Sequence, residues 1–153
     1  MTIVRGLEEA MAKLTEIGGE GERIASREIV ASALNVQRRA KERLTESEAV
    51  DTGRLRNSIT IAETDADLNT LSDQATGSEV GVKSGGKAGG REAPTMVRPG
   101  MLNAKIGTDV KYARKIEFTG PPHPRPYLFP SLEEERPQLL RRLSNELKKL
   151  ERR

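Results

Sequence analysis

The sequence has no cysteine, no tryptophan, one histidine and only four Phe or Tyr residues among 153 positions. Without cysteine the chain forms neither a disulfide framework nor a thiolate metal site, which is compatible with a reducing compartment. His123 lies between Pro122 and Pro124, with no nucleophile motif nearby. His-x-x-x-His and EF-hand spacings are also missing. We therefore expect no enzyme activity and no metal or other cofactor.

Long apolar runs are missing too, since hydrophobic residues make up 35% of the chain and charged residues 32%. No run approaches the length of a membrane span, and the first residues include acids where a secretory signal needs a basic start. We expect a single domain, residues 1–153, that is neither membrane-bound nor secreted by that route.

Charge is distributed unevenly along the chain. Residues 1–75 hold 10 Lys/Arg against 14 Asp/Glu, and residues 76–153 hold 16 against 9, which gives net charges of −4 and +7. Two explanations fit this split. One is contact with nucleic acid, and the other is head-to-tail packing of subunits in a ring, in which one surface meets a different one.

Two apolar stripes with helical spacing occupy the first third of the sequence. The first includes Leu7, Met11 and Leu14 and predicts an N-terminal helix within residues 1–20, ended by a group of glycines. The second predicts a long helix over residues 22–45. Its stripe is rich in alanine, which buries little area, so this helix needs tertiary or subunit packing. The stripe comprises Ala25, Ile29, Ala33, Val36, Ala40 and Leu44.

Residues 50–120 predict a small antiparallel sheet with long loops, because apolar and polar residues alternate there. Three strands with one buried face each are expected, around Ile59 and Ile61, around Val80 and Val82, and around Leu102, Ala104 and Ile106. The polar stretch 64–78 predicts a loop. The Gly- and Pro-rich stretch at 84–100 predicts a second loop, which we expect to be long and mobile.

Residues 121–153 predict a proline-rich clasp followed by a C-terminal helix. All four aromatic residues lie within 112–129, and five of the eight prolines lie within 121–130. Such a stiff, aromatic segment suits packing on the sheet, on a neighbouring subunit, or on both. Ser131 and Glu134 match a capping box, so we predict a helix from Ser131 with a kink or restart at Pro137. The predicted fold class is α+β.

The stretch from Val50 to Ile59 predicts a turn into the first strand. Asp51 or Thr52 is suited to capping a short helical turn, and Gly53 is suited to a positive φ. Together with residues 112–130, this stretch resembles the small head-tail joining proteins of long-tailed phages, called neck, tail-completion or minor tail components. The resemblance spans roughly residues 22–145. The positions that carry it are Asp51, Thr52, Gly53, Leu55, Arg56, Ser58 and Ile59, then Tyr112, Ala113, Glu117, Phe118, Pro126, Tyr127, Leu128 and Pro130.

Two departures from that pattern are visible. Thr119 separates the Glu-Phe pair from Gly120, where the family usually has glycine directly, and the loop at 84–100 is long. The first departure bears on a turn, and the second bears on which neighbour the loop touches. We take Phe129, inside the Pro-aromatic run, as a further structural anchor.

The resemblance implies a structural virion protein of the phage neck. Several copies, six or twelve, would form a ring that joins the head connector to the tail tube and leaves a channel for DNA. The implied partners are further copies of the chain, connector or head-completion proteins, and tail-terminator or tail-tube proteins. The implied location is the virion, after assembly in the host cytoplasm.

The alternative hypothesis is a nucleic-acid-binding protein without sequence specificity. Residues 136–153 hold seven Lys/Arg against two Glu, so the C-terminal helix is suited to meeting DNA phosphates. No aromatic residue is interleaved with those charges, which excludes a base-stacking platform on this helix.

Overall fold

The computed structural model describes residues 11, 18–47, 53–76, 90–120 and 123–152. Helices and one small antiparallel sheet make an α+β fold, as predicted. The helix predicted within residues 1–20 lies outside the described residues, apart from helical Met11 and the start of the long helix. In chain order the elements are α2 (Gly19–Glu46), α3 (Arg54–Ser58), β1 (Thr60–Ala62), α4 (Asp65–Asp73), β2 (Lys105–Gly107), α5 (Ala113–Phe118) and α6 (Leu128–Glu151).

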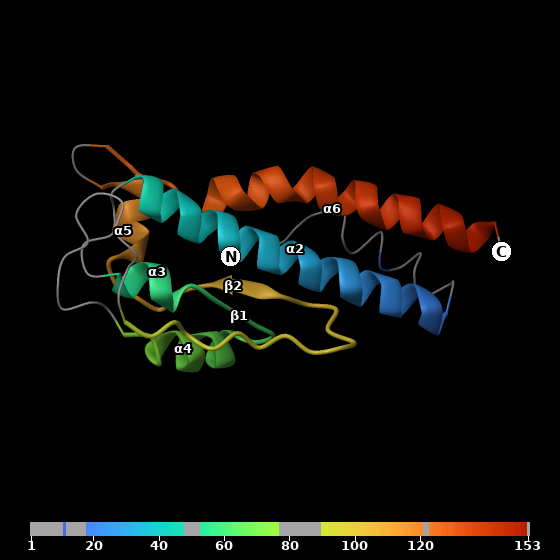
Figure 1. The fold of residues 1–153 in the computed structure, drawn as a ribbon, viewed down its shortest axis with the longest axis horizontal. Coiled ribbons are helices and arrows are strands. Elements are labelled where there is room, and N and C mark those ends of the chain that lie inside the picture. Colours follow the sequence, from blue (N-terminus) through green and yellow to red (C-terminus); the bar gives the residue numbers. More distant parts are fainter. Residues whose placement is uncertain (1–10, 12–17, 48–52, 77–89, 121–122, 153) are drawn as a thin grey trace.

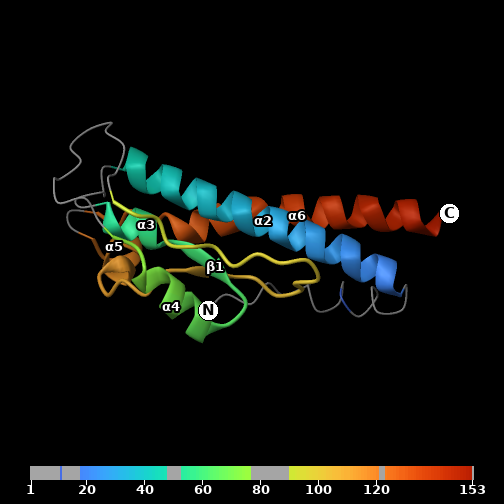
Figure 2. The same cartoon turned by 60° about the horizontal axis from the view of Figure 1, so that its bottom comes forward.

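The two long helices α2 and α6 pack side by side along the length of the molecule (Figures 1 and 2). α2 confirms the helix predicted at 22–45 and begins earlier, at Gly19. All six residues of its predicted apolar stripe are buried. The alanines of this stripe permit close approach, and Leu139 and Leu143 of α6 form one apolar cluster with Ala25.

A buried polar network joins α2 to α6. The carboxylate of Glu135, only 2% exposed, accepts hydrogen bonds from Ser32 Oγ (3.0 Å) and Asn35 Nδ2 (3.2 Å) of α2. Arg142 of α6 donates to the same carboxylate (2.7 Å) and, through Nε, to Glu28 of α2 (2.9 Å). Sliding either helix by one turn, about 5 Å, would separate these groups, so the network fixes the register of the pair.

β1 and β2 pair antiparallel, with Ile61 opposite Ile106. This confirms strands near Ile61 and Ile106, although Leu102 and Ala104 precede β2 instead of belonging to it. The expectation of one buried face was wrong for β1, where Thr60 is as buried as its neighbours. Its two sides are covered by α2 and α4, so no side of the strand faces water. The third predicted strand, at Val80 and Val82, lies outside the described residues.

The described part of the predicted loop at 84–100, residues 90–100, contains neither helix nor strand. It nevertheless bonds to the chain around β1: the N–H of Ala93 donates to the carbonyl of Asn57 (2.8 Å), and that of Met96 donates to the carbonyl of Ile61 (2.9 Å). This segment therefore satisfies the Ile61 carbonyl of β1 without forming a regular third strand.

α4 occupies much of the polar stretch that we predicted as a loop, and that prediction was wrong. Thr64 Oγ1 accepts a hydrogen bond from the N–H of Asp67 (3.1 Å), which caps the first turn. Leu68 and Ser72 form the buried side of the helix. The Thr-x-x-Asp spacing at the cap is the sequence feature that would have indicated this helix.

Two boundaries near the proline-rich segment also differ from expectation. Residues 113–118, predicted as part of the sheet region, form the helix α5. α6 begins at Leu128 instead of Ser131, whose hydroxyl donates to the carbonyl of Tyr127 (2.6 Å), so the expected capping box is not what starts the helix. α6 also continues through Pro137 without the predicted restart. Pro137 is exposed, where water can bond the carbonyl that a proline leaves unpaired.

No helix in the described part of the chain is long and apolar enough to cross a membrane.

The network around Glu135 predicts a pH-dependent stability. Burial alone would raise the pKa of Glu135, but hydrogen bonds from Arg142, Asn35 and Ser32 hold it below its ordinary value of 4.5. A lowered pKa in the folded state means that the stabilisation is complete above about pH 4.5 and is lost as the pH falls below it. Chemical denaturation of wild type should show this loss.

Glu135→Gln should lower the free energy of unfolding at pH 7 by roughly 2 kcal/mol, since Arg142 loses one of its two charged partners, keeps Glu28 and remains partly solvated. The variant should also lose less stability on acidification than wild type. The exposed neighbour Glu133 provides the control, Glu133→Gln. Equal pH dependence in Glu135→Gln and wild type would contradict the assignment.

Candidate functional site

Glu117, in α5, holds the amino terminus of α6. Its buried carboxylate accepts hydrogen bonds from the backbone N–H groups of Tyr127 (2.9 Å), Leu128 (3.1 Å) and Phe129 (2.8 Å). These are donors that an α-helix leaves without an internal partner in its first turn. The negative charge also lies at the positive end of the helix dipole. Glu117, ten to twelve positions upstream of these donors, therefore acts as the N-cap of α6.

Pro130 completes this arrangement. It is the third residue of α6 and has no N–H, so the first turn leaves no further donor that needs an external partner. Pro126 is exposed, whereas Leu128 and Pro130 are half-buried. The Glu-Phe pair and the Pro-aromatic run of the predicted site thus belong to one structural unit, the capped start of α6.

Tyr127 joins the two predicted motif stretches through the core. It is 3% exposed and belongs to the apolar cluster that also contains Leu55, Ile59 and Ala113. Burial, followed by the negative charge of Glu117, raises the pKa of its phenol. Replacing Tyr127 would therefore disturb folding as well as any contact with a neighbouring protein. Part of the proline-rich clasp thus belongs to the hydrophobic core.

The other three aromatic residues lie at the surface. Tyr112 is 43% exposed, Phe118 is 61% exposed and Phe129 is 49% exposed. Tyr112 precedes α5 and Phe118 ends it, while Phe129 is the second residue of α6 and donates its N–H to the carboxylate of Glu117. Glu117 thus holds α5 to the start of α6, and these two segments present three aromatic side chains to solvent. We call them the aromatic frame.

The first motif stretch plays a local structural role. Gly53 has a φ of 74° at the start of α3, in the left-handed region that glycine adopts without strain, as predicted. Arg56 pairs with Glu92 (3.7 Å), which ties α3 to the segment after residue 90. Asp51 and Thr52 lie outside the described residues.

A polar cluster that the sequence analysis missed lies between α4 and the chain after β2. Ser72 Oγ donates to the Asp109 carboxylate (2.6 Å), and the N–H of Asp109 donates back to Ser72 Oγ (3.0 Å). Asp73 lies against Asp109, and the hydrogen bond and charge of Asp109 raise the pKa of Asp73. For Asp109, burial would raise the pKa, but bonds from Ser72 and Asp73 lower it. Sequence spacing gives no indication of this contact, since the two elements are far apart in the chain.

The described residues contain few side chains suited to catalysis or metal binding. They contain no group of three or more His, Asp or Glu side chains that could hold a metal ion. His123 is exposed. The basic surface expected on the C-terminal helix is also reduced, because Arg142 is bound to Glu28 and Glu135, and Lys149 pairs with Glu146 (2.5 Å).

The Glu117 cap predicts a measurable stability effect. Glu117→Ala leaves three buried or half-buried N–H groups without their acceptor, so the free energy of unfolding should fall by about 2 kcal/mol. Hydrogen exchange at the amide of Phe129 should accelerate by more than that of core amides. Lys115→Ala, an exposed change on the same short helix, should alter neither quantity appreciably. Unchanged exchange at Phe129 in Glu117→Ala would count against the cap.

Comparison with known proteins gives one match. A family model described as "Bacteriophage HK97-gp10, putative tail-component" matches residues 8–118. No curated protein and no solved structure matches the chain. The matched region contains α2 to α5 and ends at Phe118, so the run Pro126–Pro130 and α6 lie beyond it. Because the match covers more than half of the sequence, the chain belongs to the HK97-gp10-like family of bacteriophage tail components.

Proposed function

We propose that the chain is a ring-forming subunit of the phage neck, which joins the head connector to the tail tube and leaves a channel for DNA. Family membership makes it a component of the phage tail, and therefore of the virion. The finer assignment adds a ring of identical subunits, six or twelve in number, between two different neighbours.

The observation that carries this proposal is the exposure of Tyr112, Phe118 and Phe129 on the aromatic frame, α5 and the start of α6. Exposed aromatic side chains are enriched at protein interfaces, where they bury a large area at a small cost in conformational entropy. Here the cap from Glu117 to α6 fixes the backbone that carries them. A prearranged backbone loses little further freedom on binding, which favours tight association.

The proposed mechanism is geometric. Each subunit would present the aromatic frame to a neighbouring protein, while the paired helices α2 and α6 keep that frame in a fixed position. Joining would then depend on complementary surfaces and on the diameter of the ring. It would require no bond-making chemistry.

Nucleic-acid binding remains the second candidate, and the exposed basic residues Arg141 and Lys148 on α6 favour it. Its signature is an affinity that falls steeply with salt, because each phosphate contact releases counterions. Retention on DNA at low salt by a monomer that ignores neck proteins would support it. Weak binding that is insensitive to salt would dismiss it.

The proposal predicts a defined mass for the purified chain in solution. Light scattering, alone and with connector and tail-tube proteins, should give a closed oligomer or a monomer that oligomerises when these partners are added. A monomer indifferent to both partners would contradict the proposal.

The aromatic frame should be needed for that assembly. Phe118→Ala combined with Phe129→Ala should weaken association at least about tenfold while leaving the circular dichroism spectrum unchanged, since both side chains are largely exposed. Leu34→Ala, at an exposed apolar residue of α2, provides the matched control. Equal loss in the control would mean that the frame has no special role.

A further inference from the structure

Basic residues form a line along the solvent side of α6. Arg141, Lys148 and Arg152 are exposed, and their spacings of seven and four residues place them on one side of a helix. This side is opposite buried Leu139 and Leu143, which pack against α2. We call Arg141, Lys148 and Arg152 the basic stripe. It extends about 16 Å along the helix axis, in the half of α6 that is far from α5 (Figure 1).

The charge of the basic stripe is not neutralised within the described part of the chain. None of its three residues forms an ion pair with a described residue. Two acids line the same hollow of the surface as Lys148 and Arg152, but both are already bound. Arg142 holds Glu28 (2.9 Å), and Glu146 is shared by Arg27 (3.2 Å) and Lys149 (2.5 Å). The stripe is therefore open to an anionic partner without the loss of an internal pair.

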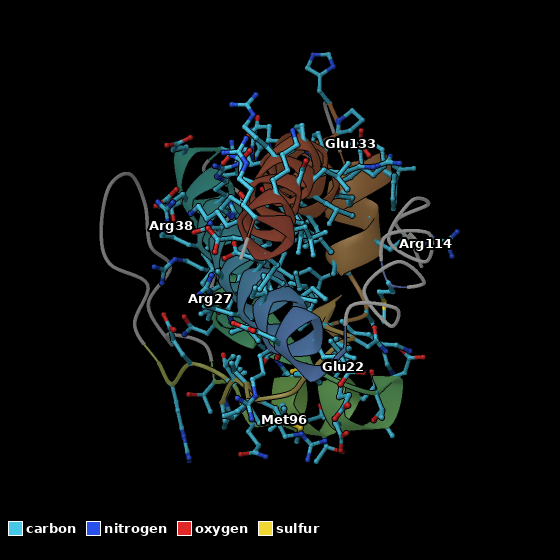
Figure 3. The ribbon with its side chains drawn as sticks, turned by 90° about the vertical axis from the view of Figure 1, so that its right-hand side faces the viewer. Glu22, Arg27, Arg38, Met96, Arg114 and Glu133 are labelled. Atoms are coloured by element: carbon cyan, nitrogen blue, oxygen red, sulfur yellow. The ribbon has the colours of Figure 1, made fainter. Side chains whose placement is uncertain are left out.

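α2 adds further cations beside the stripe. Arg27 reaches across to Glu146 of α6, and Figure 3 shows Arg27 and Arg38 on the same side of the molecule. Both arginines pair with acids, Arg38 with Glu42 (3.0 Å), yet their side chains are 63% and 61% exposed. Exposed ion pairs are weak, so these arginines exchange a carboxylate for a phosphate at little cost.

The basic stripe differs in chemistry from the aromatic frame. Among the described residues from 141 to 152, no large apolar side chain is exposed. Protein interfaces usually have an apolar or aromatic centre, which the aromatic frame provides and the basic stripe lacks. A row of exposed Lys and Arg side chains instead suits the phosphate backbone of a nucleic acid. The two surfaces thus fit two different partners.

We propose that the basic stripe faces the channel of the ring and contacts the phosphate backbone of double-stranded DNA there. This inference rests on the proposed ring and names the surface that would line its channel. Duplex DNA carries roughly nine phosphate charges over 16 Å of its axis, so each stripe meets several of them. Contacts to phosphate carry no sequence information, which suits a channel that passes DNA of any sequence.

The ring makes such a contact effective. A few exposed cations on one subunit bind weakly, but identical stripes around one duplex act together and raise the overall affinity. A channel also restricts which DNA is bound. A ring that has already closed admits a linear duplex, which enters by its end, and excludes a covalently closed circle. A stripe on the outside of the ring, or on a single subunit, binds both forms alike.

The first test compares two forms of one plasmid, linearised or relaxed and covalently closed, under the conditions in which wild type assembles. Gel retardation with the assembled protein should show retention of the linear form, decreasing steeply as salt rises. The closed circle should be retained at least about tenfold more weakly. Equal retention of the two forms would overturn the channel position.

The second test removes charge from the stripe. Arg141→Gln with Lys148→Gln should weaken retention of the linear form at least about tenfold and flatten its salt dependence, without changing the oligomeric mass. Arg91→Gln with Lys111→Gln removes the same charge from exposed positions outside α2 and α6 and should bind DNA like wild type. Circular dichroism should show the native helix content for both variants.

Each other outcome has a distinct meaning. Unchanged retention in the stripe variant, or an equal loss in its control, would overturn the inference. A stripe variant that loses oligomeric mass would show that the stripe contacts another copy of the chain. An assembled ring that retains neither form of DNA would leave the ring standing and overturn the stripe. A wild type that stays monomeric would remove the ring and its channel together, and retention of both DNA forms by that monomer would favour the second candidate function.

Discussion

The carboxylate of Glu117 at the amino terminus of α6 is the interaction on which the arrangement of the molecule depends. It fixes where α6 starts, and thereby how the Tyr127 side chain enters the core beside α2 and α3. It also sets which residues stay at the surface. Phe118, which follows Glu117, and Phe129, whose N–H donates to Glu117, both have exposed side chains. A single buried charge thus connects the helical body to the surface of greatest functional interest. Both of its oxygens accept backbone hydrogen bonds, which compensate for its burial.

Sequence patterns predicted the long helix α2 and the strands near Ile61 and Ile106, but they missed α4 and α5 and misplaced the start of α6. The stripe of α2 repeats over many turns, which leaves little ambiguity, and every one of its residues is buried. α4 has only nine residues, about two and a half turns, and its acids and small polar residues are equally typical of loops. The start of α6 was misplaced because its cap comes from a distant residue, which no local pattern reveals. Aromatic type alone also could not separate buried Tyr127 from exposed Phe129.

The interface between α2 and α6 combines alanine with buried charge, and the two have different effects. A stripe of small side chains is smooth, so apolar packing alone would tolerate several helix registers. Glu135, Arg142 and Ser32 remove that ambiguity, because the hydrogen bonds among them form only in the observed alignment. Ion pairs of this kind add little net stability compared with apolar packing, but they are well suited to specifying one arrangement. The subunit therefore has a defined shape despite its modest supply of apolar residues.

The separation of α2 and α6 along the chain has a consequence for the order of events during synthesis. Bonded partners such as Asn35 and Glu135 are 100 residues apart, so α2 leaves the ribosome long before its partner helix exists. Contacts of such high sequence separation form late, because a long loop must close first. Ala33, Ala40 and Leu44 find partners among residues 55–61, which emerge soon after α2. Ala25, which Leu139 and Leu143 cover, stays exposed until α6 emerges, so the first turns of α2 are the part that is open to contacts between nascent chains.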